Sequence, residues 1–392
     1  MNTLEREASY FFNTYKRIPL EIDHGDGVYL YSKDGTRYLD MFAGLAVNAL
    51  GYAHPRVLRA IQEQSRKYIH LSNYYLQDPQ IKLAELLIKY SGYSKLFFTN
   101  SGTEAIEGAI KISRRWGIKN GKNEIISFSN AFHGRTMGAL SLMDRPKYRD
   151  GFEPFLENCR VVEFNNIDNL RKAVSHKTVA VVLEFIQGEG GICPATPEFV
   201  EALASLKKQF GFLVVADEIQ SGLGRTGKFF GFQNFNINPD IVVIAKPLGG
   251  GLPLGAILGN EIVADVLDAG SHGTTFGGNS VACAAGIAVM EELMERGVMT
   301  NAEKVGRYFK SMLLKLQEEF PAIVREVRGY GLMIGIDLHR NADPIVTAMR
   351  ERKILINGTA DTVLRFLPPL IINEQHIDET VSSLQEIFLS YK

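Results

Sequence analysis

Two residues suited to acid–base or nucleophilic chemistry stand at the ends of consecutive apolar runs. Asp217 follows residues 212–216, and Lys246 follows residues 241–245. Because ligands bind at the carboxyl ends of the strands in an open α/β sheet, we expect this acid and this amine to face one ligand. A lysine in a dry site has a lowered pKa and can attack a carbonyl group to give a Schiff base. A structural ion pair between Asp217 and Lys246 is the alternative that these residues leave open.

A turn of small, hydroxyl-bearing residues offers a possible anion site. Residues 96–99 are apolar or β-branched, Ser101, Gly102 and Thr103 follow, and the next residues have helical character. A strand-to-helix turn of this kind points free backbone N–H groups and the positive end of a helix at an anion, usually a phosphate. An ordinary helix N-cap explains the same residues equally well. The turn therefore needs support from elsewhere in the chain.

A second glycine-rich segment, Gly222–Gly227, matches the dinucleotide motif GxGxxG literally. Its context does not fit, because residues 217–221 separate it from the preceding apolar run and no helical periodicity follows it. Asp240 also comes too early to be the acidic partner of a ribose. A nicotinamide-dependent oxidoreductase is thus the rival hypothesis from another class of enzyme, and it predicts dinucleotide binding without a covalent lysine adduct.

The elements that must position these residues alternate along the middle of the chain. Apolar runs at 124–128, 179–186, 212–216 and 241–245 predict buried strands, and the spacing of apolar residues over 199–210 predicts a helix that stops at Gly211. This alternation predicts an α/β fold with a mainly parallel central sheet covered by helices. Helical spacing over 305–316 and 377–388, with strand-like segments at 332–336 and 363–367, predicts a second, smaller α+β domain.

Composition excludes several classes of function. The 392 residues carry 43 Lys and Arg against 44 Asp and Glu, so no basic field for nucleic acid exists. The three cysteines are widely spaced, which excludes a disulfide framework and a CxxC metal pattern, and we expect no metal.

Residues 269–290 lack charged side chains but include five glycines, so they predict a loop before a buried helix and no membrane span. The charged residues 5–7 argue against a signal peptide, and we expect a cytoplasmic protein.

Six segments, in order, resemble the class III pyridoxal-phosphate-dependent aminotransferases. They are Ser-Gly-Thr-Glu-Ala at 101–105, Phe-His-Gly-Arg-Thr at 132–136, and the segments 184–191, 216–222, 245–256 and 273–279. Segments 13–19, 42–51 and 365–369 extend the resemblance to about residues 13–388, and it is greatest to the branch that acts on N2-acetyl-L-ornithine. The resemblance implies a fold-type I architecture, with a large cofactor-binding domain at 61–285 and a discontinuous small domain made of 1–60 and 286–392.

The resemblance also implies roles for individual residues toward pyridoxal 5′-phosphate. Lys246 would bind the cofactor covalently and move the proton, and Asp217 would pair with the pyridine nitrogen. The remaining implied contacts are the phosphate at Ser101, Gly102 and Thr103, the ring face at Phe132, the phenolic oxygen at Gln220, and the phosphate of a neighbouring subunit at Thr275. The last of these implies a homodimer.

On the substrate side, the resemblance makes Arg135 a carboxylate clamp, which suits the planar fork of arginine. Glu189 would pair with Arg365 in one half-reaction and release it to the α-carboxylate of 2-oxoglutarate in the other. Tyr15 and Asn48 are further substrate-side candidates, for which a structural role is the favoured alternative.

The implied reaction transfers the terminal amino group of N2-acetyl-L-ornithine to 2-oxoglutarate by a ping-pong route in arginine biosynthesis. Ornithine, succinylornithine, succinyldiaminopimelate and 4-aminobutyrate stay open as alternative donors, because selection of the acyl group depends on loop shape. A non-catalytic binding protein is disfavoured, since Lys246, Asp217 and Arg135 are all retained.

Two positions depart from the family pattern. Phe185 stands where the family usually has proline, and Tyr52 stands where it commonly has histidine. Neither change removes a catalytic group. We expect Phe185 to alter packing near the cofactor edge. His133 follows the predicted stacking residue Phe132, and a structural role for it is favoured over acid–base catalysis.

Overall fold

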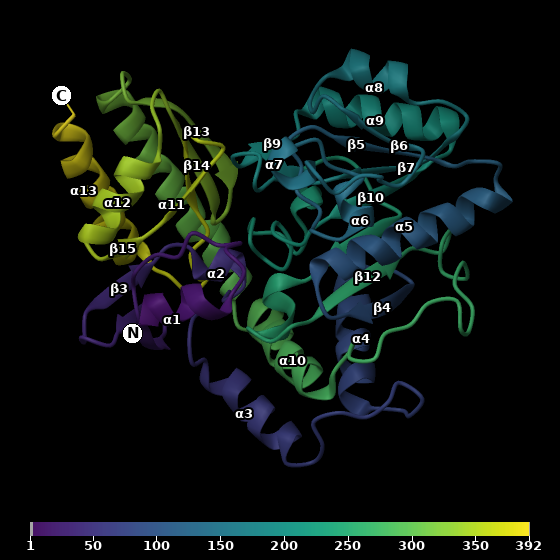
Figure 1. The fold of residues 1–392 in the computed structure, drawn as a ribbon, viewed down its shortest axis with the longest axis horizontal. Coiled ribbons are helices and arrows are strands. Elements are labelled where there is room, and N and C mark those ends of the chain that lie inside the picture. Colours follow the sequence, from purple (N-terminus) through teal and green to yellow (C-terminus); the bar gives the residue numbers. More distant parts are fainter. Residues whose placement is uncertain (1–2, 392) are drawn as a thin grey trace.

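A seven-stranded sheet forms the core of the larger part of the molecule, on the right of Figure 1. The structure is a computed structural model that describes residues 3–391. The strand order is β4 (Lys95–Thr99), β12 (Gly255–Gly259), β11 (Ile241–Ile244), β10 (Leu213–Asp217), β7 (Thr178–Leu183), β5 (Glu124–Phe128) and β6 (Cys159–Val162). β12 runs antiparallel to both of its neighbours, whereas the pairs from β11 to β6 are all parallel. The predicted fold class, a mainly parallel α/β sheet, is confirmed.

Helices cover both faces of this sheet, which explains why its central strands are almost entirely apolar. Every residue of β7 and β10 is buried. Alternate residues of β10 enter different cores: Val214 and Ala216 lie in one, and Leu213 and Val215 lie in the other. A strand that is buried on both faces has no polar side, so a continuous apolar run replaces the usual alternation.

The principal helices around the sheet are α4 (Asp78–Ser91), α5 (Gly102–Lys119), α8 (Ile167–Ala173), α9 (Pro197–Phe210) and α10 (Ser280–Glu295). α9 begins where the Thr196 hydroxyl accepts a hydrogen bond from the Phe199 backbone N–H at 3.3 Å. It ends at Gly211, whose φ of 62° is left-handed and suits glycine. The helix predicted over 199–210 and its stop at Gly211 are therefore confirmed.

Two predicted strand ends are corrected. The strand predicted over 179–186 stops at Leu183, because the Glu184 carboxylate accepts hydrogen bonds from the backbone N–H groups of Phe132 (2.9 Å) and Gly188 (3.0 Å) and the chain leaves the sheet. Residues 186–187 instead form β8 (Ile186–Gln187), which pairs with β9 (Cys193–Pro194). β11 also ends earlier than predicted, at Ile244, and Lys246 opens the short 3₁₀ turn η2 (Lys246–Gly249).

Both ends of the chain contribute to a second region beside the central sheet (Figure 1). One sheet contains β1 (Ile22–Asp26), β2 (Tyr29–Ser32), β3 (Arg37–Asp40) and β15 (Ile354–Leu355), and β15 pairs in parallel with β3. The other contains β13 (Val324–Tyr330), β14 (Met333–Leu338), β17 (Val363–Phe366) and β16 (Asn357–Thr359). Helices α11 (Val298–Glu319), α12 (Asp343–Glu351) and α13 (Glu374–Leu389) pack beside them. The predicted strands and helices of this region are confirmed.

The division into domains at 60/61 and 285/286 stays a prediction. Both boundaries fall within helices, in α3 (Pro55–Ser65) and in α10, and these two helices pack against each other. The uncharged run 269–290 is a loop up to Asn279 and then the largely buried α10, as predicted. Among residues 3–391, no helix combines the length and apolarity needed to cross a membrane. The cytoplasmic location stays a prediction.

Candidate active site

A cavity of about 450 Å³ lies at the carboxyl ends of the central strands. The residues that follow β4, β5, β7 and β11, together with the last residue of β10, all contribute to its wall. Nine of the predicted site residues line it: Ser101, Gly102, Thr103, Phe132, Arg135, Glu189, Asp217, Gln220 and Lys246. Residues spread over nearly 150 positions of the sequence are thus brought to one place, as expected for a ligand site at this edge of the sheet.

The start of α5 gives the cavity an anion-binding end. Ser101 is the N-cap of α5, and its hydroxyl accepts a hydrogen bond from the Glu104 backbone N–H at 3.3 Å. The following N–H groups have no carbonyl of an earlier turn to bond. A Cβ atom at Gly102 would lie 2.6 Å from Ile219 Cδ1, so a larger residue there would have to displace the Ile219 side chain. An 18-residue helix opening on a cavity through small residues fits a phosphate group.

Asp217 is held at the floor of the cavity by His133. The two side chains are buried, and His133 Nδ1 lies 2.7 Å from Asp217 Oδ2. Burial opposes protonation of the imidazole, but the hydrogen bond and the charge of Asp217 outweigh it, so the pKa of His133 is raised. Asp217 Oδ1 accepts a further hydrogen bond from the Ile219 backbone N–H at 3.1 Å. A carboxylate fixed in this way fits a partner that carries a proton on a ring nitrogen.

Lys246 reaches the same cavity from the next strand. Burial lowers the pKa of its amine to about 8. The charge of Glu189 raises this pKa, and the charge of Arg365 lowers it further. The Lys246 φ of 44° is unusual for a residue with a side chain, and such strain is concentrated at functional sites. A buried lysine with a lowered pKa has a substantial free-base fraction near neutral pH, which both a nucleophile and a proton carrier require.

The predicted pair of Glu189 and Arg365 is present. The Glu189 carboxylate forms an ion pair with Arg365 Nη1, and Arg365 also donates to Asn357 Oδ1 through Nε (3.1 Å) and Nη2 (2.6 Å). A weaker contact joins Arg365 Nη1 to Gln220 Oε1 at 3.4 Å. Burial raises the pKa of Glu189, but the charge of Arg365 outweighs burial, and the net pKa is lowered. Arg365 is buried and does not line the cavity, whereas its partner Glu189 does.

Arg135 lies at the exposed mouth of the cavity. Its guanidinium carbon is 4.0 Å from the ring centre of Tyr148 and 5.4 Å from that of Phe132. Stacking on an aromatic face fixes the plane of the guanidinium fork and leaves its N–H edge free for a carboxylate.

Four predicted residues do not line this cavity: Arg365, described above, and three others. Tyr15 is 68% exposed in the N-terminal segment. Asn48 lines a separate cavity of about 110 Å³ with Tyr52 and His54. Thr275 is exposed in the loop before α10. Their substrate and cofactor roles stay predictions.

Sequence reasoning did not assign a role to several residues of the site. Val47, Ile219 and residues 251–254 add to the cavity wall, and Glu184 also lines it. Burial and the nearby charge of Asp217 raise the pKa of Glu184. Its position at a strand end, directly before a glycine-rich loop, was the available signal. No residue of Gly222–Gly227 lines the cavity, and this segment opens no helix, which counts against a dinucleotide site.

Comparison with known proteins agrees with this geometry. The family model described as aminotransferase class-III matches residues 10–388. The chain belongs to this family. Class III aminotransferases use pyridoxal phosphate, and this is the cofactor of the chain. The acetylornithine aminotransferase of Methanocaldococcus jannaschii is 44% identical over 100% of this chain and 99% of the relative. The one from Aquifex aeolicus is 44% identical over 97% of this chain and 100% of the relative.

Solved structures of the same family are similar throughout. The ornithine aminotransferase of Toxoplasma gondii superposes with a TM-score of 0.94 at 29% identity, over 99% of this chain and 94% of that one. The acetylornithine aminotransferase of Elizabethkingia anophelis gives a TM-score of 0.88 at 30% identity, over 99% of this chain and 98% of that one.

The residues of this class III aminotransferase fit pyridoxal phosphate at both ends of the cavity. The N-terminus of α5 suits the phosphate, and the fixed carboxylate of Asp217 suits a protonated pyridine nitrogen. When bound, the cofactor supplies an electron sink that stabilises negative charge at the reacting carbon of the substrate. The protein then has to hold that ring protonated, place the substrate carboxylates, and supply a base. By the predicted roles, Asp217 would perform the first of these tasks, Arg135 and Arg365 the second, and Lys246 the third.

Proposed function

We propose that this aminotransferase moves the terminal amino group of N2-acetyl-L-ornithine to 2-oxoglutarate, giving N-acetyl-L-glutamate 5-semialdehyde and L-glutamate. The observation that carries the proposal is the part-buried Glu189–Arg365 pair at the cavity that Lys246 also lines, with a second arginine, Arg135, at the mouth of the cavity. A site that accepts first one carboxylate and then two needs a positive charge that is available only in part of the cycle. The names of the relatives support acetylornithine as the donor.

The two half-reactions assign different work to the two arginines. With the donor bound, Arg135 would hold its α-carboxylate while Glu189 neutralises Arg365, and Lys246 would remove the proton next to the terminal nitrogen. With 2-oxoglutarate bound, Arg135 would hold the γ-carboxylate, and Glu189 would move away so that Arg365 binds the α-carboxylate. Both arginine forks suit bidentate recognition of a carboxylate. Ornithine, succinylornithine, succinyldiaminopimelate and 4-aminobutyrate are the alternative donors for the same chemistry.

A homodimer is part of this proposal. Thr275 is exposed beside Phe276, whose ring packs on His70 with the ring centres 5.2 Å apart. Hydrogen bonds from Asn73 Nδ2 to the carbonyls of Thr274 (3.0 Å) and Gly277 (3.2 Å) hold the two segments together. The exposed apolar side chains here are Ile69, Tyr74, Tyr75, Leu76 and Phe276. Such a group of exposed side chains is typical of a protein–protein interface, and it supports a second copy with Thr275 reaching the neighbouring site.

The visible absorption spectrum tests the proposed reaction. The protein loaded with pyridoxal phosphate should show a band that depends on Lys246 and is absent from Lys246→Ala. Acetylornithine without a keto acid should bleach the band, and 2-oxoglutarate should restore it. If another donor from the group above bleaches the band and acetylornithine does not, the proposed donor is wrong while the enzyme class stands.

A further inference from the structure

The turn that carries Glu189 lies against a single row of residues in the C-terminal sheet. Arg328 of β13 pairs with Gly335 of β14, Gly335 pairs with Arg365 of β17, and Arg365 pairs with Asn357 of β16. Side chains directly opposite each other on neighbouring strands stand on the same face of a sheet. Arg328 and Arg365 therefore rise from one face, on the two sides of a glycine that has no side chain.

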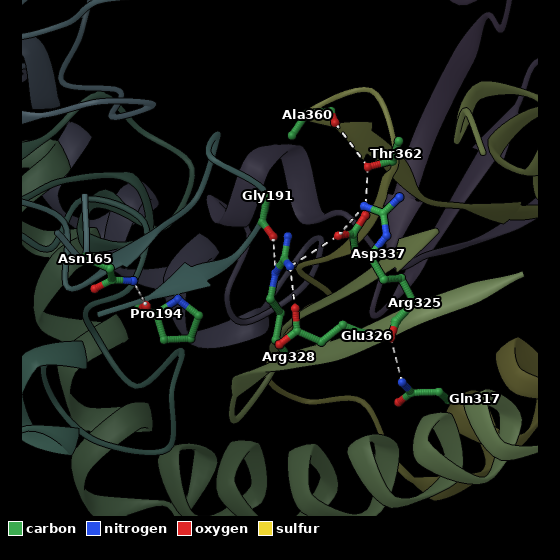
Figure 2. A network of polar contacts seen from close by, with 10 residues as sticks. All are labelled: Asn165, Gly191, Pro194, Gln317, Arg325, Glu326, Arg328, Asp337, Ala360 and Thr362. Atoms are coloured by element: carbon green, nitrogen blue, oxygen red, sulfur yellow. Dashed lines mark hydrogen bonds and ion pairs between the residues drawn. The ribbon is translucent and has the colours of Figure 1, made fainter. Parts of the chain in front are cut away.

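The turn formed by residues 188–192 fits into this gap. Arg328 Nε donates a hydrogen bond to the Gly191 carbonyl at 3.0 Å, as Figure 2 shows. The Thr359 hydroxyl donates to the Glu189 carbonyl at 2.9 Å. A Cβ atom at Gly335 would lie 3.0 Å from Ile192 Cβ, so the Ile192 side chain sits directly over the glycine. The backbone of the turn is thus attached to the sheet on both sides of the Glu189–Arg365 pair.

The conformation of the turn is one that needs such support. Ile192 is buried with a φ of 53°, which is rare for a β-branched residue and costs energy. Gly191 has a φ of 97°, and a Cβ atom there would lie 3.1 Å from Arg328 Nη2. A strained backbone of this kind persists only when its surroundings fix it. The hydrogen bond from Arg328 and the seat on Gly335 are two of the contacts that do so.

Arg328 is itself held in place by acidic neighbours (Figure 2). Its Nη1 atom lies 2.7 Å from Glu326 Oε2 and 3.4 Å from Asp337 Oδ2. Asp337 also accepts hydrogen bonds from Thr362 Oγ1 (2.7 Å) and Arg325 Nη1 (3.1 Å). The guanidinium is therefore fixed by one edge while its Nε points at the turn. Arg325 binds the same carboxylate but has no hydrogen bond to the turn, which makes it a matched control.

We infer that Arg328 is a positioning residue for substrate exchange: by holding the Gly191 carbonyl it keeps the 188–192 turn on Gly335, and this keeps Glu189 against Arg365. The inference rests on the proposed function, in which Glu189 must leave Arg365 before a second carboxylate binds there. Weakening the hold on the turn makes this release easier. It therefore favours ligands with two carboxylates and disfavours the donor, which needs Arg365 to stay neutralised.

The test compares the two kinds of ligand in the enzyme loaded with pyridoxal phosphate. Glutarate carries two carboxylates and neither an amine nor a keto group, so its binding is measured by calorimetry without turnover. We expect Arg328→Gln to bind glutarate about 3- to 10-fold more tightly, the range that corresponds to the net contribution of one hydrogen bond. The rate of the acetylornithine half-reaction, expressed as kcat/KM, should fall by a similar factor. A general structural defect would weaken both.

Three further variants make the outcome decisive. Gly335→Ala, which displaces Ile192 from its contact with residue 335, should change the glutarate affinity and the kcat/KM for acetylornithine in the same directions as Arg328→Gln. It is the substitute variant if Arg328→Gln does not fold. Arg325→Gln should leave both values unchanged. In a Glu189→Gln background, the substitution of Arg328 should have no further effect on glutarate binding.

Each negative result points to a different failure. If Glu189→Gln alone does not tighten glutarate binding, the proposed exchange between Glu189 and a carboxylate is wrong. If Glu189→Gln tightens it but neither Arg328→Gln nor Gly335→Ala does, the role of Arg328 is overturned and the proposed function stands.

Discussion

Asp217 uses its two carboxylate oxygens for two different partners, the His133 ring and the Ile219 backbone. Both contacts fix the direction of the carboxylate. A charge that is held in place before the reaction costs no reorganisation when charge develops on the ligand. The neighbouring imidazole is thus part of the site through Asp217, in keeping with the structural role expected for His133.

At this scale we predict that Asp217→Ala lowers kcat by about 10²–10³-fold, the loss typical of removing one preorganised electrostatic group. Steady-state kinetics at saturating cofactor measures it. Thermal unfolding of the same variant separates this effect from a packing defect. A variant that folds normally and keeps its kcat within a factor of about three would contradict the role of the carboxylate.

The pKa of Lys246 gives a second prediction. Burial lowers it to about 8, so the amine is mainly protonated at pH 6 and mainly free at pH 9. The rate at which the cofactor-free protein captures pyridoxal phosphate should rise about tenfold per pH unit below this value and level off above it, because only the free amine attacks the aldehyde. Stopped-flow absorbance from pH 6 to 10 measures the profile. A midpoint near the ordinary lysine value would show that burial does not act on this amine.

At the scale of elements, Phe185 explains how the chain accommodates a departure from the family pattern. Its fully buried ring packs near those of Phe232 and Phe235, with ring centres 6.2 Å and 5.6 Å away, and Phe235 continues to Tyr330 of β13. The extra ring lies in a connected aromatic group between the central and the C-terminal sheets. It does not line the cavity.

We predict that Phe185→Ala lowers the free energy of unfolding by about 3–5 kcal/mol, the usual cost of deleting a buried aromatic side chain. Phe185→Leu should cost less than half as much, because it leaves a smaller cavity. Urea unfolding of both variants measures the difference. The absorption band of the cofactor should be unchanged in both, and a shifted band would mean that Phe185 acts on the site directly.

The sequence predicts elements best where burial is regular. β5 and α9 were predicted because a mostly apolar run and a helical spacing leave few alternatives, and Gly211 marks the end of α9. The end of β7 was not predictable in this way. It depends on hydrogen bonds from Phe132 and Gly188 to Glu184, and the first of these joins residues 52 positions apart.

The same limit applies to the site. Asp217 and Lys246 line one cavity, as predicted, because both stand at the carboxyl ends of neighbouring strands that the apolar runs predict. The contact of His133 with Asp217 spans 84 positions, and the seat of Ile192 on Gly335 depends on the register of two strands. Neither leaves a local signal in the sequence, so only the assembled structure reveals them.

At the scale of the whole molecule, the exposed apolar side chains near Thr275 lead to a prediction about assembly. We expect sedimentation to give a mass of about twice 43.6 kDa at micromolar concentration. Tyr74→Glu should shift the protein toward the monomer, because it buries a charge in the interface. Leu4→Glu, at an exposed apolar position outside this group, is the control and should leave the mass unchanged. A wild-type protein that sediments as a monomer would contradict the proposed dimer.

The parallel pairing of β3 with β15 joins two strands that the ribosome makes far apart in time. β3 ends at residue 40 and its partner begins at residue 354. At roughly 5–20 residues per second, the ribosome makes the second strand on the order of tens of seconds after the first. During this interval that edge of β3 has no partner, and all seven strands of the central sheet, the last of which ends at Gly259, are made before β15. Among the paired strands, β3 therefore waits longest for its partner and has the longest exposure to chaperones.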